Sequence, residues 1–379
     1  MKHVHIRRIL RASVALALFL ITFAGSGLAA AAPAAHGDKS VAGAVYALTN
    51  APTGNEVVVW NRAGDGSLTP AGSYATGGLG SGAGLGSQGA IILSADNRWL
   101  FAVNAGSNEV SSFQVDDHDL KLISRVASGG TLPTSLAVYD DLLYVLNAGD
   151  SGNITGFVIS SRGQLGQLAD STRSLSGPAS APGQVSFSPN GALLVVTEKG
   201  ANLIDTYVVG DDGRATGPAS HPSSGATPFG FAFSKRGDLV VSEANGVPGG
   251  SAASSYDLSD DGNLELVSGS VATNQGAACW VVITKNGRYA YTANAASGSI
   301  SGFRLGHDGS LRLLNADGRT GVTGDNPSDM ALSKNSQFLY ARIGRTGSIG
   351  AFAVQADGSL KLIAGASGLP ANSAGLAAR

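Results

Sequence analysis

One strand–turn–strand pattern recurs seven times along this chain of 379 residues, and no other feature restricts the fold so strongly. Each copy has an apolar run, a second alternating strand that ends near an aromatic residue, and a hairpin turn. A period of about 49 residues predicts repeated small sheets rather than one continuous core. The marker aromatic residues are Trp60, Phe113, Phe157, Tyr207, Tyr256, Phe303 and Phe352.

Each repeat has room for four strands. Asp-Gly pairs such as 212–213 and 308–309 favour tight turns after the aromatic strand, and a leucine usually opens the strand that follows. A further strand precedes the apolar runs, and we expect it at residues 88–94, 133–138, 182–188, 228–234, 279–284 and 327–333. The chain is therefore predicted to be all-β, a seven-bladed β-propeller with four antiparallel strands per blade.

The two ends of the repeat region predict how the ring closes. The first unit begins near Val45 without a preceding strand, whereas residues 370–377 look like such a strand without a blade. We expect the C-terminal strand to complete the first blade and cover its open edge. A pair of β-sandwiches is the competing architecture, but it does not account for seven similar units.

The N-terminus has the pattern of a targeting segment. Lys2, Arg7, Arg8 and Arg11 precede an apolar run at 12–24 and small residues at 28–32. We expect a signal peptide at 1–32, a flexible mature N-terminus at 33–43 and the propeller at 44–379. The protein would then be exported, to the periplasm or outside the cell. An uncleaved anchor helix is the alternative, although the run is short for a membrane span.

Composition excludes several classes of protein. The 54 glycines show no three-residue period, which excludes collagen, and a hydrophobic fraction of 43% excludes a disordered chain. Removing four positive charges with the leader changes the net charge from −2 to −6, which disfavours nucleic acid as a partner. Cys279 is the only cysteine, so no internal disulfide can form. We expect a monomer without a membrane span after signal removal.

In a propeller, the starts of the innermost strands and the ends of the second strands lie on one face of the ring, around the mouth of the central channel. This mouth, called the funnel below, is the expected ligand site. The residues at the end of the second strand are Asn50, Asn104, Asn147, Glu198, Glu243, Asn294 and Arg342. Those at the start of the innermost strand are Gln88, Thr134, Gln184, Phe229, Trp280, Asp329 and Asn372.

Three charged residues stand where other repeats have asparagine. We expect Glu198, Glu243 and Arg342 to converge on the funnel. The glutamates would act as general acid or base, and the arginine would stabilise a carboxylate or a developing oxyanion. A charge-balanced channel mouth is the alternative interpretation. A third is a calcium site with Glu198, Glu243 and nearby asparagines as oxygen ligands; otherwise no cofactor or metal is expected.

Five further residues are predicted to contact a small-molecule or glycan ligand: Gln184, Phe229, Trp280, Asn294 and Asp329. Trp280 would supply an apolar wall. The neighbouring Cys279 has no histidine at an equivalent position, so a buried, inert thiol is favoured over a nucleophile.

Several stretches resemble the lactonase-type seven-bladed propellers, the family of 6-phosphogluconolactonase-like and carboxymuconate-cyclase-like proteins. They include TPFGFAFSKRGDLVVSEANG from residue 227, AACWVVITKNGRYAYTANAASGSISGFRL from residue 277 and SQGAIILSADNRWLFAVNAGSNEVSSFQV from residue 87. The resemblance implies lactone chemistry, as a lactone hydrolase or a muconate-cyclase-like enzyme. The substrate would be a lactone of a small organic acid or sugar acid. A non-catalytic binding or scaffold propeller, in the envelope or outside the cell, is the alternative.

Overall fold

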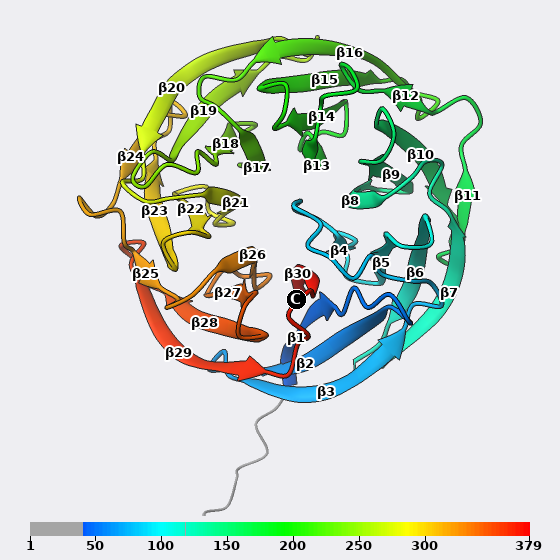
Figure 1. Cartoon of the computed structure of the whole chain (residues 1–379), viewed down its shortest axis with the longest axis horizontal. Helices are drawn as coiled ribbons and strands as arrows, with labels where there is room; N and C mark the ends of the chain where they lie inside the picture. Colours follow the sequence, from blue (N-terminus) through cyan, green and yellow to red (C-terminus); the bar gives the residue numbers. More distant parts are fainter. Residues whose placement is uncertain (1–40, 118) are drawn as a thin grey trace, which may run out of the picture. The chain divides into compact units, whose positions relative to one another are not determined.

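A computed structural model describes residues 41–117 and 119–379 and arranges them as seven β-sheets in a ring (Figure 1). Each sheet is a blade, and its strand positions are called A to D from the centre of the ring to the rim. Successive positions pair antiparallel in chain order. The predicted fold, an all-β seven-bladed propeller, is confirmed. Within the described residues, no helix has the length and apolarity needed to cross a membrane.

The first blade combines strands from both ends of the described chain. Position A is β30 (Ala374–Ala378), which pairs with β1 (Val41–Leu48) through Tyr46 opposite Ala377. The backbone amide of Arg379 also donates to the Ala44 carbonyl at 2.9 Å. The outer positions are β2 (Glu56–Ala63) and β3 (Leu68–Ala75). Closure of the ring by the C-terminal strand is therefore confirmed.

The other six blades are continuous in sequence. Blade 2 has β4 (Ile91–Leu93), β5 (Trp99–Asn104), β6 (Glu109–Val115) and β7 (Leu120–Ala127). Blade 3 has β8 (Pro133–Tyr139), β9 (Leu142–Asn147), β10 (Asn153–Ile159), β11 (Leu165–Gln167) and β12 (Arg173–Ser174). Blade 4 has β13 (Pro182–Phe187), β14 (Leu193–Glu198), β15 (Leu203–Val209) and β16 (Ala215–Pro222).

Blade 5 has β17 (Pro228–Phe233), β18 (Leu239–Glu243), β19 (Ala252–Leu258) and β20 (Leu264–Ala272). Blade 6 has β21 (Ala278–Ile283), β22 (Tyr289–Asn294), β23 (Ser299–Leu305), β24 (Leu311–Leu313) and β25 (Gly321–Val322). Blade 7 has β26 (Pro327–Leu332), β27 (Phe338–Ile343), β28 (Ser348–Val354) and β29 (Leu360–Ser367). In blades 3 and 6 the outermost position is split between two short strands, which pair with the same neighbour.

The repeat pattern has a packing reason. The marker aromatic residues on the C strands are buried and fill the space between blades. Tyrosines on several B strands tie neighbouring blades together. The hydroxyl of Tyr144 donates to the Gly213 carbonyl at 2.8 Å, and that of Tyr291 donates to the Gly358 carbonyl at 2.8 Å. Both acceptors lie in the Asp-Gly turns of the next blade, so these turns position an interblade bond as well as reversing the chain.

Two boundaries differ from those expected. Strand β1 begins at Val41 and not at residue 44, because Val41 already pairs with Ala63. The rest of the predicted N-terminal segment and the signal peptide lie outside the described residues. Strand β4 covers only 91–93 of the expected 88–94. Gln88 leaves the ladder because its amide donates to the Gly183 carbonyl of blade 4, at 3.0 Å.

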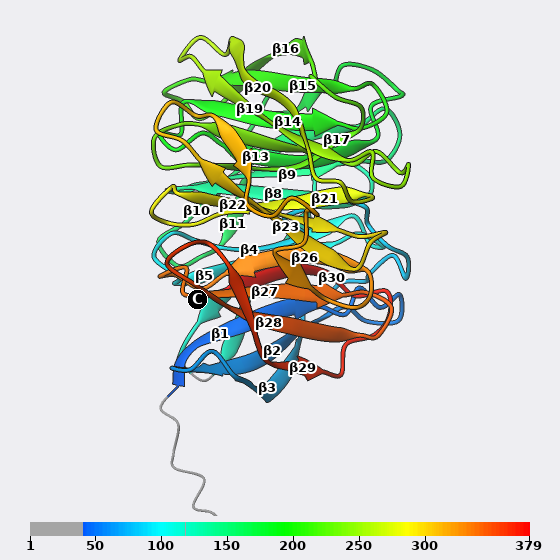
Figure 2. The same cartoon turned by 90° about the vertical axis from the view of Figure 1, so that its left-hand side faces the viewer.

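The loops and turns gather on two opposite faces of the ring (Figure 2). The D–A face holds the loops that lead from strand D of one blade to strand A of the next, and also the ends of the B strands. The A–B face holds the turns between the two innermost strands.

Candidate functional site

A pocket of about 510 Å³ opens on the D–A face, between blade 7, the closing strand and a glycine-rich loop. Trp280 and Arg342, both expected at the funnel, line it together with Ser328. Residues 84–87 of the loop and residues 371–375, which lead into and begin β30, complete most of its wall. The structure therefore brings two of the predicted site residues, from blades 6 and 7, into one cavity.

Arg342 is the central charged group of this pocket. Its Nε donates to the Ser328 carbonyl at 3.0 Å and its Nη1 donates to Ser373 Oγ at 3.1 Å, and only 8% of the residue is exposed. Burial lowers the pKa of Arg342 to about 10, and the nearby Asp329 partly opposes this shift. The guanidinium therefore stays charged at neutral pH and is held in one orientation, as anion recognition requires.

Asp329 lies behind Arg342 and not in the pocket lining. It is buried, and its Oδ1 accepts the Met330 amide at 2.8 Å. Burial raises the pKa of Asp329 to about 7, although the charge of Arg342 lowers it. This side chain modulates the charge around Arg342, and a direct contact with substrate remains a prediction.

Trp280 lines the pocket and packs against Phe229, with ring centroids 5.1 Å apart and planes tilted by 59°. Phe229 itself does not line the pocket, and its contact with a ligand remains a prediction. The indole Nε1 of Trp280 donates to the Ser87 carbonyl at 2.9 Å. Lys199 lies 4.6 Å from the centroid of Phe229, and its ammonium donates to the carbonyls of Gly86 and Pro182. These contacts fasten the glycine-rich loop to blades 4 and 6.

The same loop divides the central channel. The side chain of Gln88 donates from Nε2 to the Val281 carbonyl at 2.8 Å and accepts the Val281 amide on Oε1 at 2.9 Å. Close approach to blade 5 requires a glycine there, because a Cβ at Gly230 would lie 2.3 Å from Gln88 Oε1. Gln184 makes a comparable bridge, since its Oε1 accepts the Phe231 amide at 2.7 Å. Gln88 thus separates the pocket of Arg342 from a second cavity of about 470 Å³, which Gln88 and Val281 also line and which opens on the A–B face.

The two glutamates expected beside Arg342 have other partners: Glu198 is held by the loop between blades 3 and 4, and Glu243 is held within blade 5. Glu198 is fully buried and accepts hydrogen bonds from the Ser176 amide, at 2.9 Å, and from the Ser176 hydroxyl. Glu243 is 2% exposed and accepts a hydrogen bond from the Ser254 hydroxyl. Neither lines the pocket of Arg342. The structure does not bring the three charged residues together, and acid–base roles for the glutamates remain predictions.

Asn294 occupies the same position in blade 6 and is also buried there. Its Nδ2 donates to Ser301 Oγ at 2.8 Å and to Ser299 Oγ at 3.1 Å. The equivalent Asn104 of blade 2 donates to Ser111 Oγ at 2.8 Å. Residues at this position therefore tie strand B to strand C in several blades.

A carboxyl pair lies inside blade 4. Burial, followed by the neighbouring carboxyl group of Glu198, raises the pKa of Asp205. Among the described residues, no group of three or more histidine, cysteine, aspartate or glutamate side chains is arranged to hold a metal ion. Calcium binding by Glu198 and Glu243 stays a prediction. Cys279 is buried, and burial raises the pKa of its thiol to about 12, which disfavours a thiolate nucleophile.

The sequence reasoning missed Lys199 and the role of Gln88. Lys199 follows Glu198 directly, and alternation along a strand sends successive side chains to opposite sides. The glycine-rich stretch from residue 77 shows no regular period, and its only signal is the long interval between Trp60 and Phe113.

Comparisons with known proteins agree with the propeller fold. Residues 53–180 match the family model "Lactonase, 7-bladed beta-propeller". The fold is similar to that of a periplasmic gluconolactonase from Pseudomonas aeruginosa, with 18% identity, a TM-score of 0.68, and coverage of 87% of this chain and 98% of the other.

Two further solved structures are similar. A Lactobacillus plantarum protein has 19% identity and a TM-score of 0.72, covering 89% of this chain and 99% of that one. A Bacteroides fragilis protein, provisionally assigned as a 6-phosphogluconolactonase, has 19% identity, a TM-score of 0.70, and coverage of 92% and 100%. A search of curated sequences finds no significant match. The resemblance to the lactonase-type propellers is confirmed.

Proposed function

We propose that this lactonase-like propeller binds a lactone of a small organic acid or sugar acid, or the open acid, in the pocket of Arg342, and interconverts the two. The observation that carries the proposal is the fixed, buried guanidinium in a pocket of about 510 Å³. The family match supports the reaction class. The pocket volume lies in the range typical of small-molecule sites.

Arg342 has a clear role in such a reaction. When water attacks the carbonyl carbon of a lactone, negative charge develops on the carbonyl oxygen, and a positioned cation stabilises it. The same guanidinium matches the geometry of the carboxylate in the open acid. Trp280 supplies an apolar surface beside this charge, suited to the carbon skeleton of the ligand.

A second candidate is a binding propeller without turnover. The described residues that line the pocket include no aspartate, glutamate, histidine or cysteine, so no carboxylate, imidazole or thiolate is in place to move a proton. In that case the same pocket would hold an organic acid without converting it. We place either function outside the cytoplasm, because residues 1–32 have the pattern of an export signal.

The test is to follow acid release from a panel of aldonolactones and unsaturated acid lactones with the purified protein. We expect Arg342→Ala to lower kcat/KM by about 100-fold, in line with the loss of an oxyanion donor. Arg345→Ala is the matched control, because the Arg345 side chain at the rim is 80% exposed and pairs with Asp325 at 3.3 Å. Binding of the open acids without any acid release would favour the second candidate, whereas neither binding nor turnover would contradict both.

A further inference from the structure

The A–B face carries lysines at one repeated position. Lys235, Lys285 and Lys334 each lie two residues after the end of strand A, in blades 5, 6 and 7. The three turns share a hydrogen-bond pattern. The backbone amides of Ser234, Thr284 and Ser333 each donate to a carbonyl at or just before the start of strand B, those of Asp238, Tyr289 and Phe338 respectively. All three lysines are exposed. The repeat therefore places three ammonium groups around one side of this mouth.

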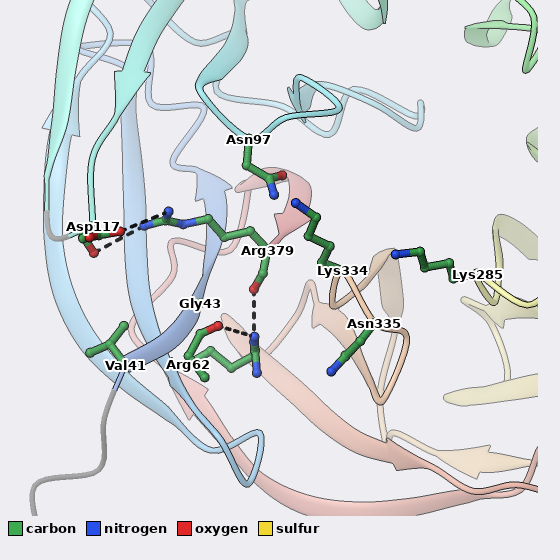
Figure 3. A pocket seen from close by; sticks show the side chains of 10 residues that line it. Val41, Gly43, Arg62, Asn97, Asp117, Lys285, Lys334, Asn335 and Arg379 are labelled. Carbon is green, nitrogen blue, oxygen red and sulfur yellow. Dashed lines mark hydrogen bonds and ion pairs between the residues drawn. The ribbon is translucent and has the colours of Figure 1, made fainter.

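A cavity of about 750 Å³ lies beside two of these lysines (Figure 3). The side chains of Lys285 and Lys334 extend into the same space as that of Asn97 (Figure 3). Arg62 and Arg379 also line it, but both have partners. Arg62 donates to the Arg379 and Ala42 carbonyls at 3.1 and 2.7 Å, and Arg379 pairs with Asp117 at 3.9 Å.

The lysines themselves lack such compensation. No ion pair between described residues includes Lys235, Lys285 or Lys334. Asp238 on the same face pairs with Arg236 at 2.8 Å, and Asp260 lines a separate small pocket with Lys235. Because the whole chain has a net charge of −2, this concentration of positive charge is a local feature of blades 5 to 7.

An apolar chamber of about 470 Å³ lies beside Lys235, and its lining includes residues 281–283 and 332, which precede the turns that carry Lys285 and Lys334. Phe231, Val282 and Leu332 line it from the A strands of the same three blades, with Lys235 at its edge. Gln88 also lines it, and the two hydrogen bonds between Gln88 and Val281 separate it from the pocket of Arg342. The A–B face thus offers apolar walls with positive charge at the rim.

We propose that this mouth is a second ligand site, which binds an amphipathic organic carboxylate. The apolar body of the ligand lies against Val282 and Leu332, and its carboxylate pairs with Lys285 and Lys334. The apolar wall and the lysines can bind one molecule together. Burial of an aliphatic or aromatic body favours binding, and so does pairing of the carboxylate with the ammonium groups. The site is independent of lactone chemistry at Arg342.

The experiment is calorimetric titration of the purified protein with octanoate, octan-1-ol and inorganic phosphate. Octanoate should bind more tightly than either the neutral alcohol or phosphate. Lys285→Ala/Lys334→Ala should weaken octanoate by about tenfold or more, the loss expected for charged hydrogen bonds. Val282→Thr, nearly equal in shape, should weaken it severalfold because it adds a hydroxyl to the apolar wall.

Two controls keep the outcome specific. Lys121→Ala/Lys361→Ala removes the same charge from exposed outer strands and should leave octanoate affinity unchanged. The lysine pair is also replaced in an Arg342→Ala background, where it should cause the same loss, which separates this site from binding of octanoate at the proposed lactone pocket. The proposal is overturned if octanoate does not bind at millimolar concentration, if the lysine pair has no larger effect than its control, or if phosphate binds as tightly as octanoate.

Discussion

Gln88 and Val281 exchange two hydrogen bonds although one precedes the innermost strand of blade 2 and the other lies in blade 6. A glutamine amide has one donor end and one acceptor end, so it can pair with both polar groups of a single residue. This contact fixes the glycine-rich loop over the D–A face and divides the channel.

We expect Gln88→Ala to lower the free energy of unfolding by about 1–3 kcal/mol, because two polar backbone groups of Val281 lose their partner. Urea denaturation measures the change. Gln164→Ala, at an exposed side chain, is the control and should have little effect. An equal loss in both variants would contradict a specific bridge.

The position of Glu243 leads to a prediction about stability. Glu243→Ala removes a buried acceptor from the Ser254 hydroxyl and leaves a cavity, so we expect a loss of about 2–4 kcal/mol in unfolding free energy. Ligand affinity at the pocket of Arg342 should change less than about twofold, because the carboxylate does not line it.

Glu243→Gln keeps the shape and one acceptor oxygen, and it serves if the alanine variant does not fold. Activity per folded molecule should be retained in this variant. Loss of activity in a folded Glu243→Gln variant would instead support the acid–base role expected from the sequence.

The carboxyl pair in blade 4 predicts a pH dependence of stability. Because burial and Glu198 raise the pKa of Asp205 above its ordinary 3.8, the folded state holds this proton more tightly than the unfolded chain does. The resulting stabilisation is complete below pH 3.8 and is lost as the pH rises through the raised pKa of the folded state.

We therefore expect the Tm of the unaltered protein to fall as the pH rises through this window. The Tm of Asp205→Asn should fall less, because the asparagine side chain stays neutral. Each unit of pKa shift corresponds to about 1.4 kcal/mol. Thermal melts between pH 4 and pH 8 measure the difference, with Asp257→Asn, on the exposed side of β19, as control. Identical pH profiles for Asp205→Asn and the unaltered protein would contradict the assignment.

Much of the fold follows from the sequence because every blade repeats the same packing problem. The buried aromatic residues, the Asp-Gly turns and the unmatched strand near residue 374 each predict a local structure that the ring then confirms. Strand β4 is the exception, since Gln88 bonds to Gly183 of blade 4 and Val281 of blade 6 and not along its own strand.

The site was less predictable, because a shared repeat position does not fix where a side chain points. Glu198 and Arg342 both stand near the end of a B strand. Glu198 bonds to Ser176 in the loop from blade 3, whereas Arg342 reaches toward Ser373 just before the closing strand. The contacts of Lys199 with Gly86 and of Gln88 with Val281 join residues far apart in the chain, and no local pattern encodes them.

The pairing of β1 with β30 has a consequence for synthesis of the protein. Blades 2 to 7 consist of contiguous segments, so each can assemble as it leaves the ribosome, but β1 must wait for a partner that follows every other strand. Throughout translation the first strands carry an unpaired edge, a known route to aggregation. Docking of Ala377 against Tyr46 is the contact with nearly the greatest separation along the chain, which makes ring closure a natural slow step of folding.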